Sequence, residues 1–249
     1  MWWACWPNRS VRWQGSFATA AIVAGGAWWS LSEPADSGTL PDPAHSPFAR
    51  ERASLGVPVL ESRTALADSL ATDPALAEPV SAALTEAVAD LHGRRAALTH
   101  PQAMSDQDRR DLEAVLYAIA DLAAGEEFTA RRLARLGAAL SVAAVSRCLP
   151  ATATGEHAVA AEGLWVLLTR SLTGIHRAHP AVLLAHSAHL RGDGVVARLA
   201  VTTALHADPA DLHARLLGAV IDRGLPPRAL HRLARSATAA AADLGITIP

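Results

Sequence analysis

Lysine is absent from this chain of 249 residues, and all 22 of its basic residues are arginines. The absence excludes three kinds of site that depend on a lysine: a phosphate-binding loop, a Schiff base and a serine–lysine dyad. The sequence also contains no GxSxG, HExxH or dinucleotide-binding motif. Arginine, alanine, glycine and proline are abundant, a bias typical of GC-rich coding. An additional arginine or histidine therefore carries little functional information.

The chain also has few cysteines and a small net charge. Cys5 and Cys148 are the only cysteines, and their wide separation argues against a disulfide framework or a thiolate zinc site. A reducing, cytoplasmic location is the simpler interpretation. The net charge of −2, with 18% charged residues, argues against nucleic acid as a partner. The hydrophobic content of 51% is enough for a sizeable core in one or two domains.

The N-terminal region allows two interpretations. Arg9 and Arg12 precede an apolar stretch, which resembles a signal peptide. That stretch is too short to span a bilayer, and Gly25–Gly26 interrupts it. The alternative is a β-hairpin in which Ala21–Val23 and Trp28–Leu31 flank a Gly–Gly turn. We favour the hairpin and expect no membrane association.

Proline, serine and aspartate dominate residues 32–50, which predicts a loop or linker. Gly56–Leu60 is a candidate edge strand, because Pro58 lacks the N–H group that a central strand needs. The pattern after this segment is helical and contains no further strand signal. We therefore predict a mainly α chain. Residues 1–60 form a short β-hairpin with a proline-rich segment, and residues 61–249 form an antiparallel helical array.

Capping signals predict the helix boundaries. Asp73–Pro74 marks the start of a helix that runs to about Leu98, and Thr129 caps another. Ser105–Asp108 resembles a capping box, so a further helix is expected to begin there and to end at Gly125. The helix that Thr129 caps is expected to turn Leu133, Leu136, Leu140 and Val145 inward. The remaining helices are predicted over 64–70, 156–172, 180–191, 194–207, 209–223 and 226–244.

Residues 183–209 carry the most informative pattern, that of one tetratricopeptide helix pair. Gly192 fits the turn of such a pair, Asp193 can cap its second helix, and Pro209 ends it. Small residues allow two antiparallel helices to approach closely. We predict a tetratricopeptide-like pair over residues 180–209. Its expected contact residues are Ala185, Ala188, Ala197 and Ala204.

Four histidines near this pair raise the question of a metal site. They are His176, His179, His186 and His189, in the pattern H-x2-H-x6-H-x2-H. The last two stand at i and i+3 on one predicted helix and could direct two imidazoles at one ion. Spacing at i and i+4 is the stronger ligand pattern, and only Asp193 could support them as a nearby carboxylate. We expect surface histidines, and no metal or other cofactor.

Three further features have both a functional and a structural interpretation. Cys148 follows Arg147, a cation that lowers a thiol pKa, but a lone cysteine there is more typical of a small buried residue. Trp165 lies among leucines and is expected to anchor the core. Arg131–Arg132 and Arg135 begin a helix and could meet an acidic partner, although a solvated face is the commoner explanation. No residue is assigned a catalytic role.

Several segments, taken together, resemble the actinobacterial family known as domain of unknown function 4192. They include GAWWSL, AEGLWVLLTR and the stretch GDG–A–AL–DP–ARLL–GLPP, and the resemblance covers roughly residues 20–235. The most specific positions are Gly192, Asp193, Gly194, Ala197, Ala204, Leu205, Asp208, Pro209, Ala214, Arg215, Leu216, Leu217, Gly224, Pro226 and Pro227. Because the family has no established activity, the resemblance implies architecture and lineage without a mechanism.

The chain also departs from the family pattern. Members usually begin with an α/β segment of several strands, which this chain lacks, and often carry a cysteine-rich stretch where this chain has SLSEPADSG. Arg147–Cys148 stands where the family often has Arg–Asp. The resemblance therefore implies a shortened member whose first 15 residues lie outside the family and are poorly packed.

The sequence leaves two functions open. The favoured one is a helical protein–protein interaction module, in which the C-terminal helix pairs provide the surface. The alternative is an enzyme or small-ligand-binding protein whose site requires the missing α/β segment. A single repeat cannot form a complete superhelical groove, because such arrays need about three or more repeats.

Overall fold

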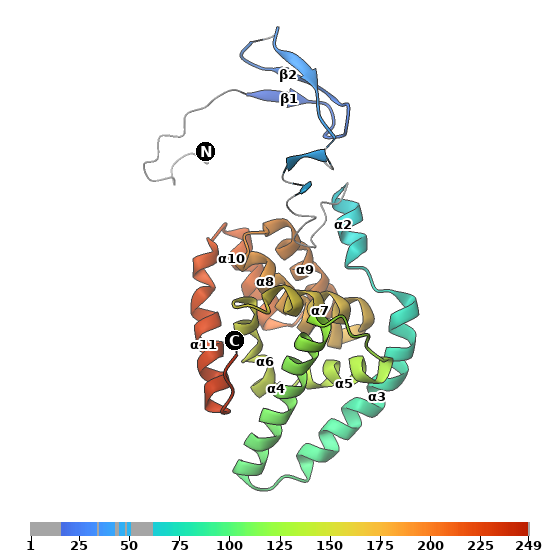
Figure 1. The fold of residues 1–249 in the computed structure, drawn as a ribbon, viewed down its shortest axis with the longest axis vertical. Helices are drawn as coiled ribbons and strands as arrows, with labels where there is room; N and C mark the ends of the chain where they lie inside the picture. Colours follow the sequence, from blue (N-terminus) through green and yellow to red (C-terminus); the bar gives the residue numbers. More distant parts are fainter. Residues whose placement is uncertain (1–15, 34, 43–44, 48, 51–61, 249) are drawn as a thin grey trace. The chain divides into compact units, whose positions relative to one another are not determined.

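The computed structural model describes residues 16–33, 35–42, 45–47, 49–50 and 62–248. The chain divides into two compact units, Met1–Leu66 and Ala67–Pro249. The described residues are mainly helical, with a small antiparallel sheet near the N-terminus, which confirms the predicted fold class (Figure 1). The candidate strand Gly56–Leu60 and the first 15 residues lie outside the described residues.

The small sheet has three strands in the order β1-β2-β3. They are β1 (Phe17–Thr19), β2 (Ala27–Ser30) and β3 (Ser37–Thr39). Trp28 lies opposite Thr19 on one side and opposite Gly38 on the other. The Phe17 ring meets the Trp28 ring edge to face, with centroids 5.2 Å apart. This aromatic pair stabilises a sheet whose strands are too short to be stable alone.

The predicted hairpin is wrong in its first strand. Ala21–Val23 is an exposed connection, and the strand that pairs with β2 is Phe17–Thr19. The Thr19 hydroxyl lies 2.8 Å from the carbonyl oxygens of both Ala21 and Ala27, which ends β1 before the apolar run. The third strand comes from the segment that composition predicts to be a loop, because a three-residue strand leaves little trace in sequence.

The second unit is built from helices, and residues 62–248 contain no strand, as predicted. The short α2 (Arg63–Ser69) crosses the boundary between the units. The helices that follow are α3 (Pro74–Ala96), α4 (Pro101–Ala123), α5 (Ala130–Leu140), α6 (Ala143–Ser146), α7 (Ala158–Ser171), α8 (Ala178–Leu190), α9 (Gly194–Ala207), α10 (Leu212–Asp222) and α11 (His231–Asp243). Three 3-10 turns, η2 (Leu149–Ala153), η3 (Gly174–Arg177) and η4 (Pro227–Ala229), connect them.

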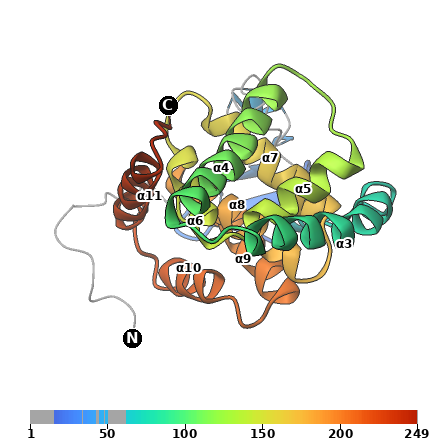
Figure 2. The same ribbon diagram turned by 90° about the horizontal axis from the view of Figure 1, so that it is seen from below.

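The core of the helical unit surrounds α8. This helix packs against α7, α9 and α10, while α3 packs along α5 and α11 packs on η2 (Figure 2). Close packing reaches the backbone at Gly137, where an added Cβ would lie 2.7 Å from a methyl carbon of Leu172. The largest fully buried side chains are Trp165, Leu112, Leu133, Leu140, Leu149, Leu164, Leu168, Leu172, Leu184, Val80, Val115 and Val145.

The predicted helix pair is present as α8 and α9. Gly192 adopts φ +84°, and its N–H donates to the His189 carbonyl, while the Asp193 N–H donates to the Ala188 carbonyl. This is the double hydrogen bond of a Schellman motif, which requires a residue with positive φ. The Asp193 carboxylate then accepts from the Val196 N–H at 3.1 Å and caps α9. All four predicted contact residues, Ala185, Ala188, Ala197 and Ala204, are fully buried.

Several predicted helix boundaries are wrong. The helix predicted over 226–244 begins at His231, after the turn η4, and the helix predicted over 209–223 begins at Leu212, where Asp211 caps it. The helix expected to begin at Ser105 begins at Pro101, because His100 caps it by accepting from the Gln102 N–H at 3.2 Å. The helix that Thr129 caps ends at Leu140, and Val145 belongs to the separate helix α6. Val145 is nevertheless fully buried, as predicted.

No single helix in the described part of the chain is both long and apolar enough to cross a membrane. Two consecutive segments, Ala130–Leu140 and Ala143–Ala153, reach the required length and composition only together, and they are bent by 83° at the break between them.

The close approach of α8 and α9 makes Ala197 sensitive to size. We expect Ala197→Leu to lower the free energy of unfolding by about 1–3 kcal/mol, because the added carbons have no space at the crossing. Urea denaturation measures the change, with Val195→Leu as the control because Val195 is 58% exposed on the same helix. Equal stability of the two variants would contradict the close packing of this pair.

Candidate functional site

The helical unit carries an open cleft between α3 and α4, with α5 between them. Its volume is about 360 Å³. The two walls meet at the short connection 97–100, and Figure 1 shows them diverging from that end. The lining residues are Ala87, Leu91, Arg94, Asp111, Ala114, Tyr117, Arg132, Arg135, Leu136, Ala138 and Ala139. Small apolar side chains thus form the inner surface, and polar side chains come from all three helices.

Three arginines line this cleft, and they differ in their partners. Arg132 pairs with Asp121, lies 3.9 Å from a Glu126 carboxylate oxygen and stacks on the Phe128 ring at 4.5 Å. Arg94 and Arg135 are exposed and form no ion pair with any residue that the structure describes. The cleft therefore presents two cations without a carboxylate partner.

The single carboxylate of the cleft, Asp111, is already engaged. It accepts a hydrogen bond from the Gln107 amide at 2.8 Å, and Arg95 lies 3.4 Å from its other oxygen. Arg95 also donates to Asp108 at 2.7 Å. This group joins α3 to α4 near their connection. Asp111 is mostly buried, so its part in this ion-pair network is structural.

The sequence predicts part of this site, since it marks Arg131–Arg132 and Arg135 as residues that could meet an acidic partner. In the structure Arg131 lies on the surface near Glu86, at 3.8 Å, while Arg135 lines the cleft. Arg94 and Tyr117 were missed, and the chain's single tyrosine next to an apolar stripe was the only signal for the latter.

The histidines differ from the expectation of surface residues. His186 and His189 are buried, at 2% and 7% exposure, and His176 and His179 are half-buried. The expectation is wrong because α8 is covered by neighbouring helices along nearly all of its length. Both ring nitrogens of His186 and Nε2 of His189 make no hydrogen bond with the described residues. No group of three metal-ligating side chains occurs in the described residues.

Burial decides the charge of these imidazoles. It lowers the pKa of His186 to about 4, with smaller contributions from the nearby His189 and His231, while the backbone of Leu230 acts in the opposite direction. Burial also lowers the pKa of His176 and of His179. A lowered pKa favours the neutral form of His176, His179 and His186 at pH 7.

Cys148 and Trp165 have the structural roles that the sequence favours. Cys148 is fully buried, and burial raises the pKa of its thiol more than the neighbouring Arg147 lowers it. Its Sγ donates to the Ala144 carbonyl at 3.2 Å. Trp165 is fully buried in the core. A neutral buried thiol is a poor nucleophile.

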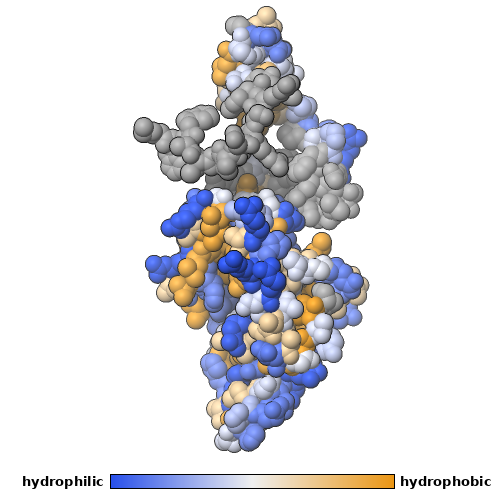
Figure 3. Space-filling model, turned by 90° about the vertical axis from the view of Figure 1, so that its left-hand side faces the viewer, coloured by the Kyte–Doolittle hydropathy of each residue, from blue (hydrophilic) through white to orange (hydrophobic). Residues whose placement is uncertain are grey.

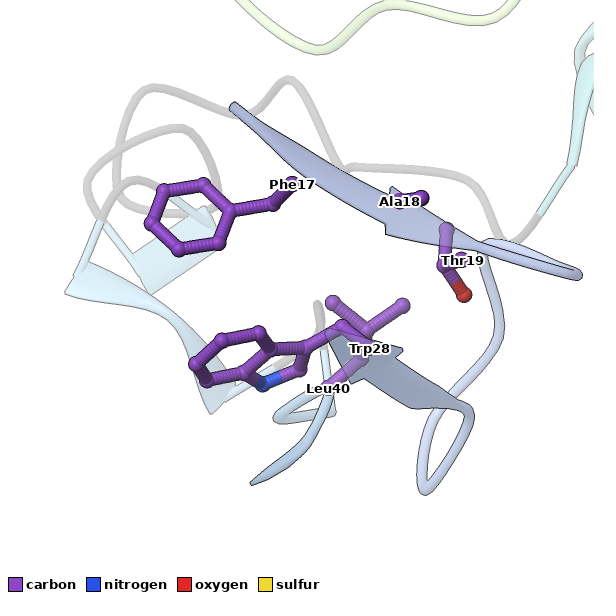
Figure 4. Close-up of a pocket in the computed structure, with 5 residues that line it drawn as sticks. All are labelled: Phe17, Ala18, Thr19, Trp28 and Leu40. Carbon is purple, nitrogen blue, oxygen red and sulfur yellow. The ribbon is translucent and has the colours of Figure 1, made fainter. Parts of the chain in front are cut away.

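Two other surfaces carry few polar or reactive side chains. A pocket of about 280 Å³ in the small sheet is lined by Phe17, Ala18, Thr19, Trp28 and Leu40, with the Thr19 hydroxyl and the Trp28 indole N–H as its polar side-chain groups (Figure 4). The side of the helical unit that carries α10 and α11 shows hydrophobic side chains among hydrophilic ones (Figure 3). The exposed leucines of this region are Leu212, Leu216, Leu225 and Leu233. Neither surface brings together the polar groups that a reaction requires.

The buried His186 predicts a pH-dependent stability. Its folded pKa lies below its unfolded value, so the unfolded chain binds the proton more readily, and stability falls as the pH drops from about 6.5 to about 4. We expect His186→Leu to remove on the order of 3 kcal/mol of this loss. Urea unfolding at neutral and acidic pH measures it, with the exposed His92→Leu as the control. An unchanged acid sensitivity of His186→Leu would contradict the assignment.

Comparison with known protein families gives a match over most of the chain. The family described as "Domain of unknown function (DUF4192)" matches residues 4–228. The match includes most of the first 15 residues, so the expectation that these lie outside the family is wrong. No curated protein and no solved structure matches the chain. Since the family match covers most of the sequence, the chain belongs to the DUF4192 family.

Proposed function

We propose that this protein is a cytoplasmic, helical protein–protein interaction module that binds its partner through the cleft between α3 and α4. One observation carries the proposal: an apolar inner surface lies beside Arg94 and Arg135, two exposed guanidinium groups without a carboxylate partner in the described chain. Apolar contact area with an arginine at its edge is the composition that protein interfaces favour. The free thiol of Cys148 is consistent with a reducing compartment.

The cleft is a better binding surface than the C-terminal helix pair. The first helix of a tetratricopeptide-like pair must be accessible to form a groove. Here α8 is buried along nearly its whole length, with α7, α9 and α10 packed against it. The outer residues of α9 and α10 remain exposed, but the cleft combines apolar area with unpaired charge.

An enzyme or small-ligand-binding protein is the second candidate, and the size of the cleft favours it. A volume of about 360 Å³ is comparable to that of small-molecule pockets. The lining residues, however, include no histidine, cysteine or serine, and the only carboxylate is held by Gln107 and Arg95. Among the lining residues, the Tyr117 hydroxyl is the remaining candidate for acid–base chemistry.

A photo-crosslinker in place of Tyr117, which is 66% exposed at the cleft, tests the proposal in cells of the native host. We expect one discrete protein adduct. Ala114→Trp should abolish it, because the indole would fill the cleft. Ala120→Trp, at an exposed position of the same helix outside the cleft lining, should leave the adduct unchanged.

The absence of an adduct, or an adduct that survives Ala114→Trp, would contradict binding in the cleft. Native mass spectrometry of the purified full chain distinguishes the second candidate. A small molecule that remains bound to the wild type and is lost in Ala114→Trp would establish the ligand-binding protein instead. Thermal melting of both tryptophan variants verifies that they are folded.

A further inference from the structure

We infer that the cleft recognises an acidic segment of a partner protein, in which carboxylates flank one or more apolar side chains. The inference rests on the proposed function and specifies the chemistry of the partner. It follows from the charges that the fold leaves unpaired, from the apolar character of the surface between them and from the way in which the cleft is closed at one end.

The charged residues of the cleft indicate the charge of its ligand. The chain as a whole is slightly acidic, with a net charge of −2, yet the cleft has three arginines and one carboxylate. Arg132 is neutralised by Asp121 and Glu126, and Asp111 is held by Arg95 and Gln107. Arg94 on α3 and Arg135 on α5 have no ion-pair partner among the described residues. The lining itself carries three arginines against one carboxylate, and the carboxylates of Asp108, Asp121 and Glu126 lie beside it in pairs with Arg95 and Arg132.

The second step concerns the groups that match this charge. A guanidinium is planar and donates two parallel hydrogen bonds to a carboxylate. Arg94 belongs to α3 and Arg135 to α5. A ligand that binds both arginines needs either two carboxylates or one carboxylate that lies between them. A segment with two carboxylates satisfies both arginines.

The third step concerns the surface between the arginines. Leu91 and Leu136 are buried at 3% exposure each, and small alanine side chains cover the rest of the inner surface. Tyr117 adds an exposed ring from the opposite wall. Apolar side chains gain from burial against such a surface, whereas a simple inorganic anion or a nucleic acid backbone would leave it unused. An acidic peptide with apolar residues uses both features of the cleft.

The cleft is closed at one end by ion pairs between α3 and α4. The Arg95–Asp108 hydrogen bond of 2.7 Å and the Arg95–Asp111 contact bridge α3 and α4 where they meet. Each of these groups already has a partner, so they are not available to a ligand. A ligand is thereby left with the other lining residues, which include Arg94, Arg135 and Tyr117.

Selection from a library of short random peptides tests the inference. The full chain is the target, and the Arg94→Glu/Arg135→Glu double variant is the counter-target. We expect the enriched peptides to contain aspartate or glutamate on both sides of an apolar residue. Their affinity should fall at least about tenfold for the double variant and should weaken at high salt, because the contacts are between charges. Ala114→Trp should also abolish their binding.

The control is Arg232→Glu/Arg235→Glu, which makes the same change in net charge on exposed residues of α11. It should bind the selected peptides as the wild type does. Peptides without acidic residues that depend on the cleft and bind both double variants equally would overturn the inference and leave the interaction module intact. Failure to enrich any peptide that Ala114→Trp rejects would overturn both proposals.

Discussion

The enclosure of α8 is the constraint on which the helical unit depends. Ten of its thirteen residues are buried, and they lie on every side of the helix. A helix of this kind has no solvated face, so it is stable only when α7, α9 and α10 cover it. Ala181, Ala185 and Ala188 allow the close approach of its neighbours, and Ala181 packs with Ala204 of α9 and Ala214 of α10. The same enclosure removes the groove that a tetratricopeptide-like pair offers.

In this lysine-free chain, arginine side chains form hydrogen bonds and ion pairs that join segments far apart in sequence. The half-buried Arg177 donates to the carbonyls of Thr169 and Leu70, at 2.8 and 2.7 Å, and so joins the end of α7 to the segment before α3. Arg170 pairs with Asp73, the cap of α3, at 3.1 Å, and the Asp73 N–H donates back to the Arg170 carbonyl. A planar guanidinium can satisfy two acceptors from distant parts of the chain, which a point-like ammonium does less well. These bonds fix the start of α3 on α7.

Local signals predicted the helices well, and tertiary contacts explain most of the errors. The helix 194–207 and its Asp193 cap were correct because capping and periodicity depend on neighbouring residues. His186 was misplaced because its burial is imposed by other helices, which a histidine count cannot reveal. The first strand was misplaced because Thr19 ends it through its hydroxyl. The cleft was not predicted as a unit, because its lining comes from three helices that are separated in sequence.

The connection between α3 and α4 and the charges on the cleft walls explain why the cleft stays open. The connection 97–100 and the Arg95–Asp108 bond hold α3 and α4 together at one end. Further along, alanines line both walls, Ala87 on α3 and Ala114 on α4. Closing the gap would also remove Arg94 and Arg135 from water without a partner, and an unpaired buried charge is strongly destabilising. The two exposed guanidinium groups therefore oppose closure of the cleft.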